Sequence, residues 1–103
     1  MSKSPTTTKK FAPVHPGQVL AEDLRDAGIS MNQLAKALQV PMNRISAIVN
    51  GQRGITGDTA VRLARYWGTS AQYWMNLQSR YELEVAQDAL ADSISQIKPR
   101  SAA

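Results

Sequence analysis

The sequence has 103 residues, of which 43% are apolar, which suffices for one domain with a modest core and is too little for two. It holds no cysteine and no apolar run of about 18 residues, so a disulfide scaffold and a membrane span are both excluded. The basic N-terminus lacks the apolar stretch of a secretory signal, and we therefore expect a cytoplasmic protein.

The net charge of +4 is unevenly distributed along the chain. Residues 27–81 hold six lysines and arginines against a single acid, Asp58, which gives this stretch a local charge of +5. Residues 82–92 hold four acids and no base, a local charge of −4. The middle of the chain could therefore face a polyanion and the later segment could not, although ordinary charge scatter on solvated helices remains an alternative.

The chain reads as a series of helices, and the first is predicted over residues 15–28. Pro16 suits the first turn of a helix, Glu22 and Asp23 place acids early in the segment, and Gly28 is a typical terminator. Nothing in the sequence reads clearly as a strand, so we expect an all-α domain.

The second and third predicted helices are joined by a turn of only a few residues. The second opens with Ser30, whose side chain can form a capping box with Gln33, and it ends near residue 38 or 39. Pro41 cannot continue a helix but suits the first turn of a new one, so the third helix is predicted from Pro41 to Asn50, where Gly51 ends it. The two helices form a helix-turn-helix pattern.

Two further helices complete the predicted domain. The fourth has Thr56 as its cap and Gly68 as its terminator. The fifth begins after residue 69 or 70 and runs past Tyr81, with Pro99 as an outer limit. The expected fold is therefore an all-α, five-helix domain whose last helix is extended.

The third helix has one apolar and one polar face. At 100° per residue, its branched aliphatic side chains fall within about 60° of one another: Ile45, Ile48 and Val49. The opposite side carries small uncharged side chains, with Met42 and Arg44 on its flanks: Asn43, Ser46, Ala47 and Asn50. A solvated face normally mixes Glu and Lys, so an acid-free face with Asn and Arg suits a DNA major groove, where amides bond base edges. A plain surface helix is the alternative.

Two features of the sequence around this helix fit phosphate contacts. The N-terminus of a helix presents free N–H groups that favour anions, and Arg53 lies just beyond the helix end, within reach of a second phosphate.

Residues 13–87 resemble the helix-turn-helix of the Cro and phage-repressor class, the XRE family, and more closely the HigA-type antitoxins. The segments "NRISAIVNGQRGIT" and "ARYWGTSAQYWMNLQ" together are specific for this resemblance, and "PVHPGQVLAEDL" resembles the opening segment of the same family. The resemblance implies a lambda-repressor-like fold and two linked activities: repression of the protein's own operon, and neutralisation of a HigB-type toxin, a ribosome-associated messenger-RNA endonuclease.

The resemblance also assigns roles to residues. Positions matching Met42, Asn43 and Ala47 usually address bases, and positions matching Arg44, Asn50 and Arg53 more often serve backbone or supporting contacts. Because Ala47 offers only a methyl group, a thymine methyl is its expected partner. Ser46, on the same face, and Gln33, at the start of the second helix, complete the candidate DNA-binding set. Many relatives have glycine where this chain has Gln39, so Gln39 is expected to adopt a left-handed conformation at a cost of about 1 kcal/mol.

The fifth helix carries two apolar stripes, and a single small domain needs only one of them. The first is expected to pack on the core: Trp74, Leu77, Tyr81 and Val85. The second is a candidate surface for a sister subunit, for the toxin, or for both: Leu83, Ala86, Leu90, Ile94 and Ile97. The alternative is a solvated helical edge on which Leu90 simply covers the core. A dimer is expected, because one such helix reads only a few base pairs and dimers place two recognition helices about 34 Å apart.

These elements divide the chain into four parts: a flexible tail over residues 1–12, a DNA-binding domain over 13–81, a helical extension over 82–97 and a flexible tail over 98–103. An enzyme is not expected. His15, the single histidine, stands at a helix entrance where it suits a cap, and the sequence has neither metal-ligand spacing nor a phosphate-cradling glycine loop. We therefore expect operator DNA, a toxin and a second copy as partners, with no cofactor, metal, small-molecule substrate or membrane.

Two functions remain open at this point. One is an autoregulatory antitoxin that reads operator DNA as a dimer. The other is a stand-alone regulator of the same family, or a protein-binding adaptor that keeps the fold without DNA binding.

Overall fold

The computed structural model describes residues 12–101, and these residues form an all-helical fold without strands. In chain order, the helices are α2 (Pro16–Ala27), α3 (Met31–Leu38), α4 (Met42–Val49), α5 (Gly57–Trp67), α6 (Ala71–Ala89) and α7 (Ala91–Ile94). The five predicted helices correspond to α2 through α6. Within the described part, no helix is long and apolar enough to cross a membrane. The predicted N-terminal tail lies outside the described residues apart from residue 12, whereas residues 98–101 of the predicted C-terminal tail are described and are exposed and outside any helix.

The helices begin and end largely where their local sequence indicates. Ser30 Oγ accepts a hydrogen bond from Gln33 N–H at 3.0 Å and Gln33 Oε1 accepts from Ser30 N–H at 2.7 Å, so the capping box is confirmed. Thr56 caps α5, and Gly28 and Gly68 close α2 and α5 in the left-handed conformation. Ser70 caps α6 through a bond from Tyr73 N–H.

Two predicted boundaries need correction. Because α2 begins at Pro16, Glu22 and Asp23 lie beyond its first turn, which holds no acid and gains no favourable charge from them. Pro41 is not the first residue of α4 but its N-cap, with an extended backbone, and the helix ends at Val49 with Asn50 as the C-cap.

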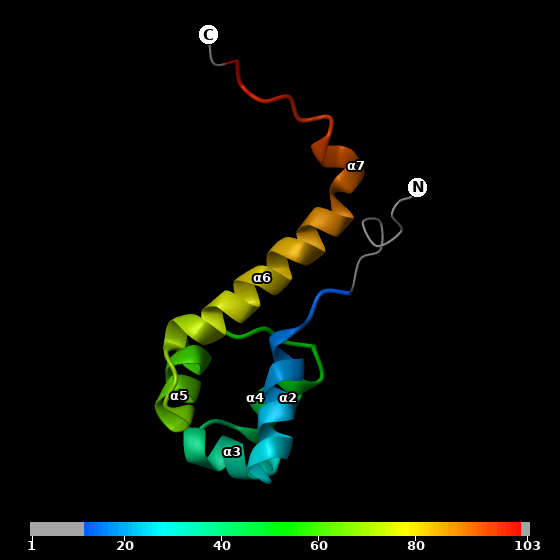
Figure 1. The fold of residues 1–103 in the computed structure, drawn as a ribbon. Coiled ribbons are helices and arrows are strands. Elements are labelled where there is room, and N and C mark those ends of the chain that lie inside the picture. Colours follow the sequence, from blue (N-terminus) through cyan, green and yellow to red (C-terminus); the bar gives the residue numbers. More distant parts are fainter. Residues whose placement is uncertain (1–11, 102–103) are drawn as a thin grey trace, which may run out of the picture.

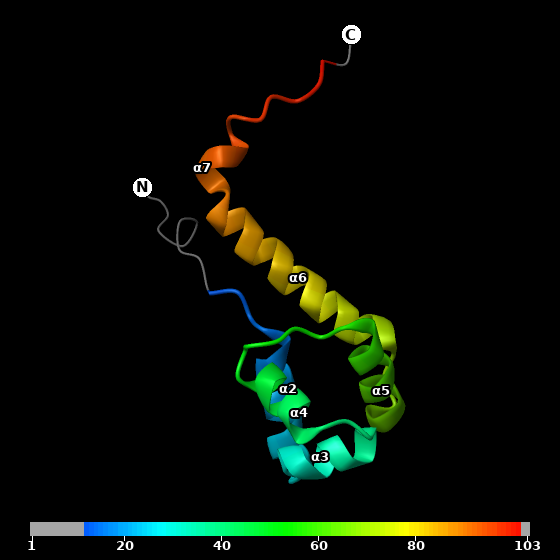
Figure 2. The same cartoon turned by 180° about the vertical axis from the view of Figure 1, so that it is seen from behind.

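The core lies where α2, α3, α4, α5 and the start of α6 meet (Figures 1 and 2). Its buried apolar residues are Leu20, Leu24, Leu34, Ala35, Leu38, Ile45, Ile48, Ile55, Ala60, Leu63 and Trp74. The start of α2 lies directly against the end of α4, because a Cβ added at Gly17 would overlap the Ile48 carbonyl oxygen. Glycine at this position therefore allows the two helices to approach closely.

Only the first half of α6 belongs to this core. Trp74 is fully buried, Leu77 packs against the core and Tyr81 is half-buried, as predicted, but Val85 is 40% exposed and its predicted core position is wrong. The reason is that α6 extends beyond the packed helices (Figure 1), and none of its residues after Gln78 is buried. Gln78, which was not predicted to be buried, is the last buried residue of α6.

Beyond Gln78, none of the described residues is buried. The helix breaks at Leu90, which is the C-cap of α6 and the N-cap of the four-residue α7. Leu90 is 46% exposed, so it does not cover the core. Below, residues 13–81 are called the head and residues 82–97 the extension; Figure 2 shows the extension running away from the head.

Candidate nucleic-acid interface

The turn between α3 and α4 depends on one strained residue. Gln39 has φ 62° and ψ 45°, and it is the one non-glycine residue with positive φ in the described part of the chain. The N–H groups of Gln39 and Val40 donate to the carbonyls of Lys36 and Ala35 and so close the end of α3. The expected left-handed conformation is confirmed, and it turns the chain sharply enough for α4 to start after two residues.

The two faces of α4 are oriented as predicted. Ile45 and Ile48 are fully buried, and Val49 packs against the core from a half-buried position. On the opposite side, Met42 is 46% exposed and Asn43 is exposed.

The polar face continues through the middle and the end of α4. Ser46 and Ala47 are half-buried, and Asn50 at the end of the helix is exposed. The Ser46 hydroxyl donates to the Asn43 carbonyl at 3.3 Å, so its oxygen can still accept a bond from outside. The outward face of α4 therefore presents amide, hydroxyl and methyl groups with no carboxylate.

The start of α4 has no side-chain cap, because Pro41 offers no hydrogen-bonding side chain. The four other helices of the head, α2, α3, α5 and α6, each begin with a side chain that accepts a backbone N–H. The first N–H groups of α4 therefore remain without a side-chain acceptor, an arrangement that favours an anion from outside.

Arg44 is held by an ion pair inside the head. Its Nη1 lies 2.8 Å from Asp58 Oδ1, the same oxygen that accepts from Arg62 Nε at 2.7 Å. Arg62 also donates to the Leu38 carbonyl at 2.8 Å, so the cluster ties α3, α4 and α5 together. The hydrogen bonds from Arg62 and Arg44 lower the pKa of Asp58 below its ordinary value. The lone acid of the basic stretch thus holds two arginines in place, which the charge count alone did not show.

Arg53 follows α4 in a loop that is anchored to the helix. The N–H groups of Gln52 and Arg53 donate to the Ala47 carbonyl at 2.8 and 3.2 Å, and Gly51 turns the chain with φ 77°. The Arg53 side chain is exposed and has no partner among the described residues. Its guanidinium is therefore accessible from outside the head, and the phosphate contact beside α4 stays a prediction.

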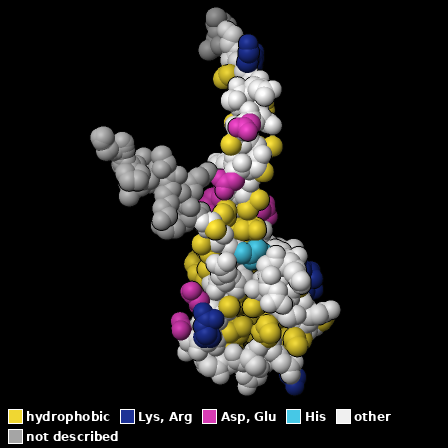
Figure 3. Space-filling view, turned by 90° about the vertical axis from the view of Figure 1, so that its right-hand side faces the viewer, with side chains coloured by type: hydrophobic (Ala, Val, Ile, Leu, Met, Phe, Trp, Pro, Cys, Tyr) yellow, Lys and Arg dark blue, Asp and Glu magenta, His cyan; other side chains and the backbone are white. Residues whose placement is uncertain are grey.

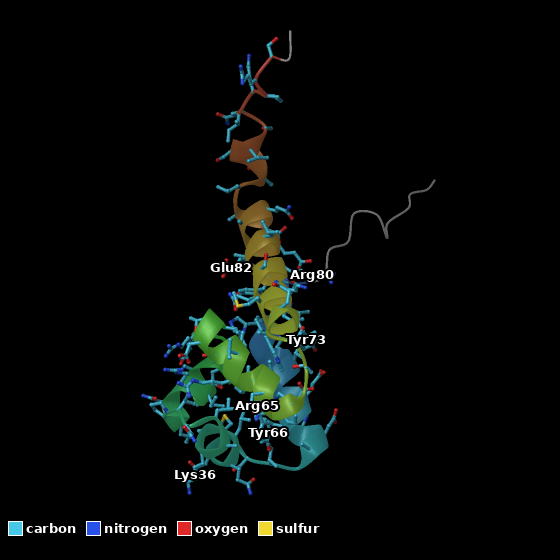
Figure 4. The ribbon with its side chains drawn as sticks, turned by 90° about the vertical axis from the view of Figure 1, so that its left-hand side faces the viewer. Lys36, Arg65, Tyr66, Tyr73, Arg80 and Glu82 are labelled. Carbon is cyan, nitrogen blue, oxygen red and sulfur yellow. The ribbon has the colours of Figure 1, made fainter. Side chains whose placement is uncertain are left out.

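The capping box occupies one end of the Gln33 amide. Its Oε1 is occupied by the Ser30 N–H, so its amide NH2 is the group that remains for a phosphate. Lys36 on α3 and Arg65 on α5 add positive charge to the head, where Figure 4 shows both side chains.

The four predicted interface residues of the extension lie together on one side. Leu83, Leu90 and Ile94 are 58%, 46% and 55% exposed, and Ala86 is also exposed. They line a shallow groove of about 150 Å³ with Gln87, and we call these five residues the extension groove. Figure 3 shows acidic and hydrophobic side chains along this part of the molecule.

His15 serves the fold. Its Nδ1 accepts a hydrogen bond from Gly17 N–H at 2.9 Å, which confirms the predicted cap, and burial lowers its pKa below the ordinary value. No group of three or more histidine or acidic side chains in residues 12–101 is placed to hold a metal ion.

This geometry, two helices joined by a tight turn with the second one exposing a polar face, defines a helix-turn-helix protein. The helix-turn-helix family model matches residues 20–74. Virulence-associated protein I of Dichelobacter nodosus is 48% identical over 81% of this chain and 78% of its own length.

Two solved structures are similar over most of the chain. An addiction module antidote protein of the HigA family from Coxiella burnetii has a TM-score of 0.83 and 44% identity, over 87% of this chain and all of that chain. The antitoxin HigA of Pseudomonas aeruginosa with the higBA promoter has a TM-score of 0.83 and 46% identity, over 86% of this chain and 99% of that chain. The chain belongs to the XRE-type helix-turn-helix family, in its HigA antitoxin branch.

Proposed function

We propose that this protein is an autoregulatory cytoplasmic antitoxin: it binds operator DNA as a dimer through α4, represses its own operon and neutralises a HigB-type messenger-RNA endonuclease. The observation that carries the proposal is the outward face of α4, which is exposed, polar and free of acids. The similarity to HigA antitoxins, one of them solved with promoter DNA, supports it.

Within this proposal the residues divide by chemistry. The Asn43 amide bonds a base edge, while Met42 and Ala47 make apolar contacts, Ala47 with a thymine methyl. Ser46 and Asn50 supply further polar contacts along the same face. The remaining side chains of the interface contact phosphates: Arg44, Arg53 and the NH2 group of Gln33.

Arg44 carries out this role from a fixed position. Its Nη1 is engaged by Asp58, but a guanidinium has five N–H donors, and its side chain is 23% exposed. A phosphate can therefore bind the remaining donors while Asp58 keeps the guanidinium oriented, which lowers the entropy lost on binding.

A dimer and a toxin complex require surfaces outside the DNA-binding face. The extension groove is apolar and exposed, and acids flank it, among them Glu82, Glu84 and Asp92. An apolar row of this kind on a surface helix is typical of a protein interface. Acidic flanks also favour a basic partner such as a ribosome-directed nuclease.

The DNA-binding part is tested by titrating the protein against a duplex of its own promoter and against variants of that duplex. Asn43→Ala should cost about 1 to 3 kcal/mol at one base pair and relax the preference there. Asn76→Ala, a matched change on the exposed side of α6, should leave binding unchanged. Equal binding by wild type and Asn43→Ala to all base variants would refute the assigned face.

The toxin-binding part is tested by co-expression with the protein encoded next to this gene. Replacing Leu90 and Ile94 with arginine should disrupt the extension groove without touching the core. Loss of the complex with a small basic neighbour, read by size-exclusion chromatography, supports the groove as the toxin surface. Monomerisation with the complex intact assigns the groove to the dimer instead.

The alternative function is a stand-alone regulator or an adaptor of the same fold. It is favoured if the neighbouring reading frame encodes no small basic nuclease, or if the purified protein ignores its promoter.

A further inference from the structure

A buried glutamine connects α6 with the loop that follows α4. Gln78 is 7% exposed, and its Oε1 accepts a hydrogen bond from the Ile55 N–H at 2.7 Å. On the other side its Nε2 donates to Glu82 Oε2, also at 2.7 Å. The two residues bonded through Oε1 are 23 positions apart in the chain, so this amide bridges two elements that the local sequence does not join.

The loop lies directly against this amide. A Cβ added at Gly54 would fall 2.7 to 2.9 Å from the amide atoms of Gln78, closer than real Cβ atoms come to other heavy atoms. Glycine at position 54 therefore lets the loop backbone contact the amide, and any side chain there would push the two apart.

Glu82 sets the orientation of the amide. An ionised carboxylate can only accept hydrogen bonds, so it must face the NH2 group of Gln78. The carbonyl oxygen then faces Ile55, whose N–H needs an acceptor because the residue is 3% exposed. Figure 4 shows Glu82 on α6 at the level where the helix leaves the head.

The anchored loop carries Arg53. On one side the Ala47 carbonyl holds the Gln52 and Arg53 N–H groups, and on the other side Gln78 holds the Ile55 N–H. Arg53 belongs to the first anchor through its own N–H, only Gly54 separates it from Ile55, and its side chain is exposed. Loss of either anchor would let the backbone of Arg53 move relative to α4.

We propose that Gln78, which is remote from the α4 face, is a positioning residue for DNA binding: it holds the loop of residues 51–55 so that Arg53 meets a phosphate beside α4. The proposal rests on the proposed function, since it needs DNA at α4. It assigns to α6 a role in the DNA interface that the apolar stripes of that helix did not suggest.

The test uses the full chain and two duplexes, one from the protein's own promoter and one of random sequence. Gln78→Met keeps the length and volume of the side chain but removes both hydrogen bonds. Gly54→Ala keeps Gln78 but displaces its amide. Each is combined with Arg53→Ala, and Gln72→Met, an exposed glutamine on the same helix, is the matched control.

We expect Gln78→Met and Gly54→Ala each to weaken binding to both duplexes by about tenfold and to reduce the salt slope by about one, as the loss of one phosphate contact does. Adding Arg53→Ala to either variant should then cost little more, because the contact is already lost. Hydrogen exchange at the Ile55 amide should accelerate in both variants without DNA. Gln72→Met should leave DNA affinity, the salt slope and this exchange rate unchanged.

A purely structural role predicts a different result, which would overturn the proposal: a lower melting temperature with an unchanged salt slope, and an effect of Arg53→Ala that simply adds. The proposal also fails if Asn43→Ala weakens promoter binding while Arg53→Ala does not, and in that case the proposed function stands. If the wild-type protein binds neither duplex, the proposed DNA binding and the positioning role of Gln78 are both refuted.

Discussion

The head and the extension of this chain treat their apolar side chains in opposite ways. In the head, Leu20, Leu34, Ile45, Ile48 and Trp74 are completely buried. In the extension, no residue is buried. Its large apolar side chains are all at least 40% exposed: Leu83, Val85, Leu90, Ile94 and Ile97.

The two regions also differ in how their helices begin. In the head, α2, α3, α5 and α6 each start with a side chain that accepts a backbone N–H and α4 does not, whereas α7 in the extension has no such cap. The head therefore satisfies most of its helix starts and buries its own core, while the extension leaves an apolar row exposed. The difference teaches that the same kind of residue stabilises the fold in one region and stays exposed in the other, where we propose that it serves association.

The largest expected contrast comes from truncating one apolar side chain in each region. Ile45→Ala should lower the free energy of unfolding by about 2 to 5 kcal/mol, because it leaves a cavity in a close-packed core. Leu90→Ala should change it by less than about 0.5 kcal/mol in dilute protein, because Leu90 is already exposed. Urea unfolding at several protein concentrations measures both, and equal losses at the lowest concentration would contradict the comparison.

A smaller change in the free energy of unfolding is expected at the contact between α2 and α4. Gly17→Ala should destabilise the head by about 1 to 3 kcal/mol, since its Cβ would meet the Ile48 carbonyl and push the two helices apart. Gly57→Ala, at the start of α5 with open space around it, should instead stabilise by about 0.4 to 1 kcal/mol. Thermal unfolding separates the two, and a neutral Gly17→Ala would show that the head tolerates displacement of α4.

The smallest expected effect is a pH dependence of the folding stability, and it arises where the start of α2 contacts α6. The His15 ring caps α2 and contacts the Tyr81 ring edge-on, with 4.8 Å between the ring centres. Burial lowers the pKa of His15 in the folded state, so the unfolded chain binds the proton more tightly. The stability from this group is complete above about pH 6.5 and is lost as the pH falls through the lower pKa of the folded state.

His15→Asn is the matched variant for this prediction, because Asn still accepts the Gly17 N–H but does not titrate. The melting temperature of the wild type should fall more between pH 7.5 and pH 5.5 than that of His15→Asn. The difference should correspond to no more than about 1 kcal/mol, the usual value of a cap. Parallel curves for the two proteins would show that His15 does not titrate in this range.

Much of the fold follows from contacts between near neighbours in the sequence. The capping box of Ser30 and Gln33 spans three residues, and Gly28 and Gly68 end their helices through their own backbone freedom. The period of 3.6 residues predicted which side of α4 is buried. The exposed face with Asn43 and Asn50 could therefore be predicted before any tertiary contact was known.

The contacts that orient the candidate interface join residues far apart in the chain, and periodicity says nothing about them. Asp58 holds Arg44 across 14 positions, Arg62 reaches the Leu38 carbonyl across 24 and Gln78 holds Ile55 across 23. A hydrophobic pattern shows which face of a helix is apolar, but not which polar side chain meets which backbone group once the helices pack. For the same reason Val85 was assigned to the core and Gln78 was not: the point at which α6 leaves the head depends on where the other helices end.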